Sequence, residues 1–139
     1  MNTDQSAFFF SNEKIPRKEW VQLHLCIVDR GSKYSVTGGA VEGVDDIKKF
    51  LERVKKDKKY AKATHNSYAA RIAINGQVIE RKSDDGETGA GMIILRQLRK
   101  ANMVNVVIVV TRWYGGVKLH ADRFKHVQDG TRLVIEELS

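Results

Sequence analysis

The sequence predicts an α+β fold, a two-layer sandwich in which helices cover one face of a mixed sheet. Along the chain, the hydrophobic period switches between two residues, typical of strands, and three to four residues, typical of helices. The predicted order of elements is ββαββαβα, which combines hairpins with a single strand between helices. The length of 139 residues is that of one ordinary domain, large enough for a hydrophobic core without metal or disulfide bonds.

The first two strands form a predicted hairpin. Apolar residues alternate with polar ones over residues 21–27, and the partner strand covers 33–41. The turn-like residues 29–32 connect them, so we expect an antiparallel pair. The glycine pair 38–39 predicts a bulge or bend in the second strand. A helix is predicted over 45–59, because the apolar spacing becomes helical behind two acidic residues.

A second hairpin and a second helix follow. Residues 68–74 again alternate, and Asn75-Gly76 is a favoured two-residue turn into the strand 77–81. The apolar stripe of residues 88–100 predicts a helix, with Thr88 as its N-cap.

The last strand and helix contain the most informative feature of the chain. Residues 105–111 are almost wholly apolar and β-branched, which predicts a strand buried on both faces. Behind Asp122, apolar residues at intervals of three and four predict a C-terminal helix ending near 138. Between them lies Arg112-Trp113-Tyr114-Gly115-Gly116, which places a cation and two amphipathic rings beside two permissive glycines. This corner suits a structural clasp or a binding site.

The charge distribution predicts a basic surface. The formal net charge is +7, and its densest block is a lysine cluster after the first helix. Such a block attracts phosphate backbones, so RNA or the ribosome is one candidate partner. A solvated helix end that complements the helix dipole is the alternative interpretation. The candidate nucleic-acid residues are Lys55, Lys56, Lys58, Lys59 and Lys62.

The remaining composition predicts a soluble, cytoplasmic monomer without a membrane segment. Cys26 is the only cysteine, which excludes an intramolecular disulfide and favours a buried, inert thiol in a reducing compartment. The apolar residues 8–10 are too few for a signal peptide or a membrane span. We expect residues 1–18 to be a flexible leader and 19–139 to form the single domain.

Polar groups from three separate segments form the predicted site. We expect Arg112 to pair with Glu87 or Asp85 as an internal brace, or else to face a phosphate. The acidic cluster precedes a helix, where unpaired amides favour negative charge, and it matches no complete metal-binding loop. We therefore assign no catalytic residue, no metal ligand and no cofactor. The candidate binding residues come from three blocks that resemble a protein family, and they are His65, Asn66, Asp84, Asp85, Glu87, Arg112, Trp113, Tyr114, Gly115, Gly116, Arg123 and Lys125.

Three blocks of the sequence resemble the IMPACT family in both order and spacing. They are Ala63-Thr64-His65-Asn66-Ser67-Tyr68-Ala69-Ala70-Arg71-Ile72, Asp84-Asp85-Gly86-Glu87-Thr88, and Val107 to Gly116 with Asp122-Arg123-Phe124-Lys125-His126. The residues of the last block are similar to those of the eukaryotic branch of the family. In the first hairpin, Ser32 and Tyr34 resemble the family's basic-Ser-x-aromatic strand entry.

The resemblance implies a fold and a function. The fold is that of the second domain of small-subunit ribosomal protein five. The function is translational control: eukaryotic relatives restrain the kinase that phosphorylates initiation factor two during amino-acid starvation, by competing for its ribosome-bound activator. Those relatives typically carry an N-terminal RWD domain, and only about 18 residues precede the first predicted strand here. We therefore expect the IMPACT domain without the RWD domain, and a protein partner in translational control.

Two other function classes remain beside the noncatalytic regulator. An RNA- or ribosome-binding module would use the lysine block on phosphates, with binding that weakens steeply with salt. A hydrolase would use Asp85 or Glu87 as the general base and His65 as an acid or metal ligand. The hydrolase requires these three side chains to converge within hydrogen-bond reach in one cleft.

Overall fold

The computed structural model describes residues 12–139 and contains one five-stranded sheet. The strands are β1 Val21–Asp29, β2 Ser32–Ala40, β3 His65–Ile74, β4 Gln77–Ser83 and β5 Val106–Trp113. The helices of the described residues are α2 Asp45–Lys55, α3 Lys58–Ala61, α4 Ala90–Lys100 and α5 Asp122–Leu138. This order confirms the predicted α+β class and adds the short helix α3.

The described strands are all antiparallel, so the predicted mixed sheet is wrong. The sheet order is β1-β2-β5-β3-β4, and both neighbours of β5 run antiparallel to it. The two hairpins are antiparallel as well. The strands β2 and β3, which α2 and α3 connect, do run parallel to each other. Because β5 lies between them, they form no direct pair.

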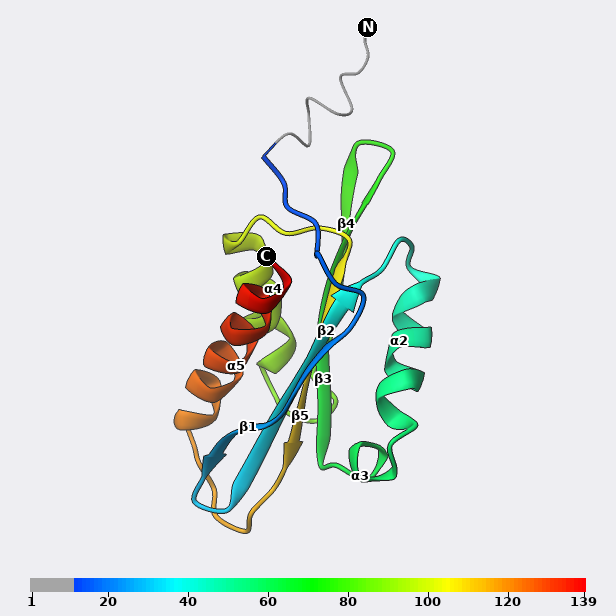
Figure 1. Cartoon of the computed structure of the whole chain (residues 1–139). Coiled ribbons are helices and arrows are strands. Elements are labelled where there is room, and N and C mark those ends of the chain that lie inside the picture. Colours follow the sequence, from blue (N-terminus) through cyan, green and yellow to red (C-terminus); the bar gives the residue numbers. More distant parts are fainter. Residues whose placement is uncertain (1–11) are drawn as a thin grey trace, which may run out of the picture.

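Helices cover both faces of the sheet, so the expected two-layer arrangement with helices on one face is also wrong (Figure 1). Helices α4 and α5 pack over one face, which includes Val106 and Ile108 of β5. Helix α2 packs over the opposite face, which includes Val107 and Val109. Successive side chains of a strand point to opposite faces, and both faces of β5 are apolar, so each of them needs a cover. The prediction that this strand is buried on both faces is confirmed.

Both hairpins lie where the sequence predicts them, but the irregularity in the first one is elsewhere. The register shifts in β1 between Leu23 and Ile27, while Gly38 and Gly39 pair regularly with β5. A Cβ atom at Gly38 would lie 2.5 Å from Val134 Cγ1, and one at Gly39 would lie 1.9 Å from the carbonyl oxygen of Glu19. These glycines therefore allow close packing and do not bend the strand.

Two helix boundaries differ from the prediction for local reasons. The expected helix 45–59 ends at Lys55, and Asp57 begins a new turn because its carboxylate accepts a hydrogen bond from the amide of Lys59, 2.9 Å away. Helix α4 begins at Ala90 behind Gly89, and the predicted cap Thr88 makes no cap hydrogen bond there.

The described part of the expected leader is attached to the domain. Lys14 pairs with Met103 in an isolated parallel bridge, and the amide of Arg17 donates to the carbonyl of Leu138 at 2.8 Å. Residues 1–11, which include the apolar residues 8–10, lie outside the described residues.

The structure tests the expectation that the thiol of Cys26 is buried. Cys26 is half-buried instead of fully buried, and burial raises the pKa of its thiol. Within residues 12–139, no helix has the length and apolar character that crossing a membrane requires.

Candidate functional site

The predicted site is assembled at the end of the central strand. In the β3–β5 ladder, His65 pairs directly with Arg112, so two of the three sequence blocks meet through main-chain register. The turn between β4 and α4 places the third block beside the other two. His65 Nδ1 lies 2.9 Å from the carbonyl oxygen of Asp85 in this turn. The predicted convergence of His65, Asp85 and Arg112 is thus present in the structure.

A buried ion pair lies at the centre of this arrangement. Arg112 Nη1 donates to both carboxylate oxygens of Glu87, at 2.9 and 3.0 Å, and both side chains are nearly inaccessible to solvent. Arg123 Nη1 reaches the same carboxylate at 3.2 Å from the first turn of α5. Glu87 therefore joins β5 to α5 through two guanidinium groups. This geometry matches the internal brace that the sequence predicts for Arg112.

The two aspartates of the acidic turn accept hydrogen bonds from main-chain amides. Asp84 accepts hydrogen bonds from the amides of Gly89 and Gly91, at 3.0 and 2.8 Å, and so caps α4. The amide of Gly89 is the main cause that lowers the pKa of the Asp84 carboxyl. Asp85 accepts from the amide of Asn66 at 2.7 Å. The negative charges of the two aspartates therefore stabilise the start of α4 and the start of β3. This is the structural role that the sequence analysis gave as the alternative to metal binding.

Asn66 belongs to a buried network behind the ion pair. Its side-chain nitrogen donates to the carbonyl of Tyr60 at 3.0 Å, and its oxygen accepts from the hydroxyl of Thr111 at 2.7 Å. The residue is 5% exposed. It therefore connects α3, β3 and β5, and its side chain does not reach solvent.

The aromatic residues after Arg112 face different surroundings. Trp113 is half-buried against the ring of Tyr60, and its Nε1 donates to the carbonyl of Lys59 at 3.0 Å. Tyr114 is 47% exposed, with its ring 5.7 Å from the Arg112 guanidinium carbon. The sequence alone does not decide whether these two amphipathic rings lie in the core or on the surface. The structure makes Trp113 a packing residue and Tyr114 a surface residue.

Gly115 is required by a close approach to the first hairpin. A Cβ atom on it would lie 2.0 Å from the carbonyl carbon of Gly31. Its amide donates to the hydroxyl of Ser32 at 3.1 Å, and Arg112 Nη2 donates to the same hydroxyl at 3.3 Å. The β1–β2 turn and the β5–α5 loop thus lie together at one end of the sheet (Figure 1). Gly116 has a positive φ of 89° and open space around it.

Ser32 belongs to this arrangement, although the sequence analysis did not select it. Its side chain is fully buried and accepts hydrogen bonds from two members of the signature segment. The signal was its place in the family-like strand entry of the first hairpin, directly before a predicted strand.

A pocket of about 300 Å³ opens beside the ion pair, and we call it the signature pocket. It is lined by His65, Glu87, Arg112, Tyr114, Lys118, Leu119, His120 and Arg123. Lys125, which the sequence placed in the site, is exposed on α5 and is not part of this lining. Asn66, Asp84, Asp85 and Trp113 support the pocket without lining it.

A second pocket, the lysine pocket, lies on the other side of Tyr114 and has a volume of about 570 Å³. It is lined by His24, Leu25, Gly31, Lys33, Lys59, Lys62, Trp113 and Tyr114. Of the predicted lysine block, Lys59 and Lys62 line it, while Lys55, Lys56 and Lys58 do not.

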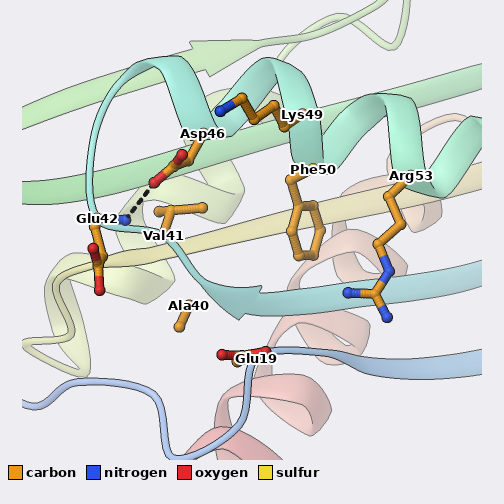
Figure 2. Close-up of a pocket in the computed structure, with 8 residues that line it drawn as sticks. All are labelled: Glu19, Ala40, Val41, Glu42, Asp46, Lys49, Phe50 and Arg53. Carbon is orange, nitrogen blue, oxygen red and sulfur yellow. Dashed lines mark hydrogen bonds between the residues drawn. The ribbon is translucent and has the colours of Figure 1, made fainter.

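A third pocket, of about 310 Å³, lies between α2 and the end of β2 and contains no predicted site residue (Figure 2). Its Asp46 accepts hydrogen bonds from the amides of Glu42 and Gly43, at 2.9 and 3.1 Å. These bonds lower the pKa of the Asp46 carboxyl and hold the loop before α2. Its lining contains the carboxylates of Glu19, Glu42 and Asp46 and the cations Lys49 and Arg53, so their charges nearly balance.

The geometry does not favour the hydrolase. His65 Nε2 lies 4.0 Å from Glu87 Oε2, beyond hydrogen-bond reach, and its Nδ1 contacts a main-chain oxygen instead of the Asp85 carboxylate. The Glu87 carboxylate already accepts from two arginines. Across residues 12–139, no group of three or more His, Cys, Asp and Glu side chains is arranged to hold a metal ion.

Comparison with known proteins gives a consistent result. Residues 30–135 match the model of the Impact N-terminal domain. Protein IMPACT of Rattus norvegicus is 41% identical over 113 residues, and the Protein IMPACT homolog of Schizosaccharomyces pombe is 38% identical over 118 residues. These matches cover 80% and 84% of this chain but only 36% and 42% of the relatives. The chain thus spans less than half the length of these curated relatives.

Two solved structures share the fold. One, described as a hypothetical protein, has a TM-score of 0.77 and 26% identity, and the match covers 90% of this chain and 60% of that one. The other is the two-domain translational regulator Yih1, with a TM-score of 0.59 and 31% identity. That match covers 99% of this chain and 53% of the Yih1 chain.

Proposed function

The chain belongs to the Impact N-terminal domain family, and from this membership we propose that it is a noncatalytic translational regulator of the IMPACT type. The observation that carries the proposal is the similarity to the translational regulator Yih1 over 99% of this chain. The regulator acts in the cytoplasm as a monomer, through a protein partner in translational control. Its effect is to restrain the kinase that phosphorylates initiation factor two during amino-acid starvation.

The site geometry supports a binding role. The side chains that the family resemblance singles out are mostly paired with one another, as Glu87 is with Arg112 and Arg123. This pairing holds the β5–α5 loop in place, where Tyr114 and Val117 are both 47% exposed. An exposed aromatic ring on a rigid corner is a common anchor in protein interfaces. We therefore place the partner contact at this loop.

The proposal is tested by overproducing the protein in amino-acid-starved cells and measuring phosphorylation of initiation factor two. We expect the wild type to lower it, and Tyr114→Ala to lower it less because the anchor ring is lost. Leu133→Ala is the matched control, since Leu133 is exposed to 40% on α5 and lies outside the loop. Unchanged phosphorylation on overproducing the wild type would contradict the regulatory function.

A second function is favoured by the lysine pocket. Two residues of the predicted lysine block, Lys59 and Lys62, line it together with Lys33. The exposed ring of Tyr114 lies beside them and offers a surface on which a base can stack. This arrangement suits single-stranded RNA, including RNA on the ribosome.

Salt-dependent RNA binding separates this function from the first. The double variant Lys59→Gln/Lys62→Gln should weaken binding and lower the slope of log affinity against log salt concentration by about two. The control Lys48→Gln/Lys100→Gln removes the same charge from exposed positions outside the pocket. Equal losses in both double variants would show that only the net charge matters.

A further inference from the structure

The signature pocket has an excess of positive charge. Its lining contains three permanent cations, Arg112, Lys118 and Arg123, but only one carboxylate, Glu87. Two positive charges therefore remain unbalanced in the lining, apart from the two histidines. Because the pocket is partly enclosed, these charges interact with a bound anion more strongly than they would on an open surface.

The one carboxylate is already paired. Both oxygens of Glu87 accept from Arg112, and one of them also accepts from Arg123. Its residual exposure is 4%. Glu87 therefore fixes the positions of the two guanidinium groups, and it does not occupy their remaining donors.

Several donors of the lining are free. Both hydrogen bonds of Arg123 use Nη1, which leaves its Nε and Nη2 without a protein acceptor in the described part of the chain. Arg112 Nε is buried and has no hydrogen-bond partner among residues 12–139. Lys118 is exposed and forms no ion pair with the described residues. Because Arg112 Nε is inaccessible, the free donors open to a ligand in the pocket are those of Arg123 and Lys118.

The neighbouring carboxylates are engaged by main-chain amides. Asp84 is directed to the amides of Gly89 and Gly91, and Asp85 to the amide of Asn66. Neither of them lines the pocket. These amide hydrogen bonds partly offset the repulsion that the two carboxylates exert on an anion in the pocket.

We propose that the signature pocket binds the phosphate group of a phosphate monoester. Such a group carries a charge close to −2 near neutral pH, with three strong acceptor oxygens. This charge matches the excess of the lining, and the oxygens match the free donors of the planar Arg123 guanidinium and the Lys118 ammonium group. A carboxylate would balance only one of the two charges.

The pocket volume limits what can carry the phosphate. About 300 Å³ is at the lower end of the range for small-molecule sites, so a phosphate on a short carbon chain fits better than a whole nucleotide. The carrier is either a phosphorylated serine of a protein partner or a free small phosphate. The serine source rests on the proposed function, because it requires a protein partner at this loop, whereas the pocket chemistry does not.

The test is a titration of the ¹⁵N-labelled protein followed by NMR at low salt. The probes are N-acetyl-O-phosphoserine methylamide, inorganic phosphate and unphosphorylated N-acetylserine methylamide. We expect saturable shifts at the amides of His65, Arg112, Tyr114 and Arg123 with the two phosphates only. Tighter binding of the phosphoserine probe assigns the site to a phosphorylated side chain. Equal binding of both phosphates assigns it to a free phosphate.

Lys118→Gln and Lys125→Gln form the matched pair of variants. Both lysines are exposed, so neither change should disturb folding. Only Lys118 lines the pocket. We expect Lys118→Gln to weaken phosphate binding by about threefold and Lys125→Gln to leave it unchanged. Arg123→Gln should weaken it by about tenfold. Absent shifts, or equal weakening by both lysine variants, would overturn the proposal. The titration uses no translation component, so its failure leaves the regulatory function standing, and the cell experiment can fail without affecting the pocket.

Discussion

At the scale of single residues, Arg112 has a role that its charge alone does not describe. Its two terminal nitrogens contact Glu87 and Ser32, and its guanidinium carbon lies 5.4 Å from the ring of Tyr34. Burial raises the pKa of Tyr34 to about 12, so this ring stays neutral beneath the cation. A planar fork is needed to reach Glu87 and Ser32 together.

Arg112→Lys should therefore destabilise the protein although the charge is kept. An ammonium group cannot contact Glu87 and Ser32 with the same geometry, so we expect the free energy of unfolding to fall by about 2 kcal/mol. Urea denaturation measures this change. The exposed Arg81 gives the control, because Arg81→Lys should change the free energy by less than about 0.5 kcal/mol. Similar midpoints for both variants would show that the fork geometry of Arg112 is unimportant.

The sequence predicted which residues lie together better than it predicted what each of them contacts. The sequence identified His65, Glu87 and Arg112 as one site and preferred the brace that the structure contains. It did not select Ser32, although this serine lies in the family-like strand entry, because its burial and its contact with Gly115 appear only in the structure. Whether these residues bind a partner stays a prediction.

At the scale of elements, α5 is held to the first hairpin by charged contacts. His126 Nε2 lies 2.7 Å from Asp29 Oδ2, and Arg30 pairs with both Asp29 and Asp122. Asp122 is the first residue of the helix, and its side chain makes this contact with Arg30. Hydrogen bonds from Arg30, followed by His126, lower the pKa of the Asp29 carboxyl to about 2.

This shift predicts the pH dependence of stability. The pKa of Asp29 in the folded protein lies below its unfolded value of about 4, so its ionised form stabilises the fold above that pH. The stabilisation is lost as the pH falls from about 4 towards 2. Asp29→Asn should lower the urea midpoint at pH 6, and the difference from the wild type should shrink towards pH 2. A difference that stays constant with pH would contradict the linkage. The exposed Asp45→Asn serves as the control.

The hairpins and the amphipathic helices could be predicted because their signals are local. The turn Asn75-Gly76 connects β3 and β4 as predicted. The start of α4 was missed, because its amides are capped by Asp84 from outside the helix. A cap at such a distance from the helix start has no simple sequence signature.

At the scale of the whole molecule, the sheet separates two hydrophobic cores. The core under α4 and α5 includes Ile94 and Leu98, and the core under α2 includes Phe50 and Val54. Phe50 is 7% exposed and lies 4.9 Å from the ring of Trp20, measured between centroids. Helix α2 is therefore part of the folded core and not an appendage at the sheet edge.

Phe50→Ala tests this three-layer arrangement. We expect a loss of about 3 kcal/mol in the free energy of unfolding, because a large ring is removed from a packed core. Thermal and urea denaturation, followed by circular dichroism, measure the change. Leu133→Ala removes an exposed apolar side chain and should cost less than about 0.5 kcal/mol. An equally small effect of Phe50→Ala would mean that the second face of the sheet carries little of the stability.

Apart from the short helix α3, the order of elements could be read from the sequence, as could the two hairpins, the doubly buried strand and the IMPACT family, because periodicity, turn residues and motif spacing are local properties. The position of β5 between β2 and β3 and the cover on both faces of the sheet could not. Nor could the orientation of Glu87 towards two arginines while Asp84 and Asp85 turn to backbone amides. These features depend on contacts such as that between Arg112 and Ser32, which are 80 positions apart. Long-range partners of this kind are selected when the layers pack together, and no local pattern in the chain specifies them.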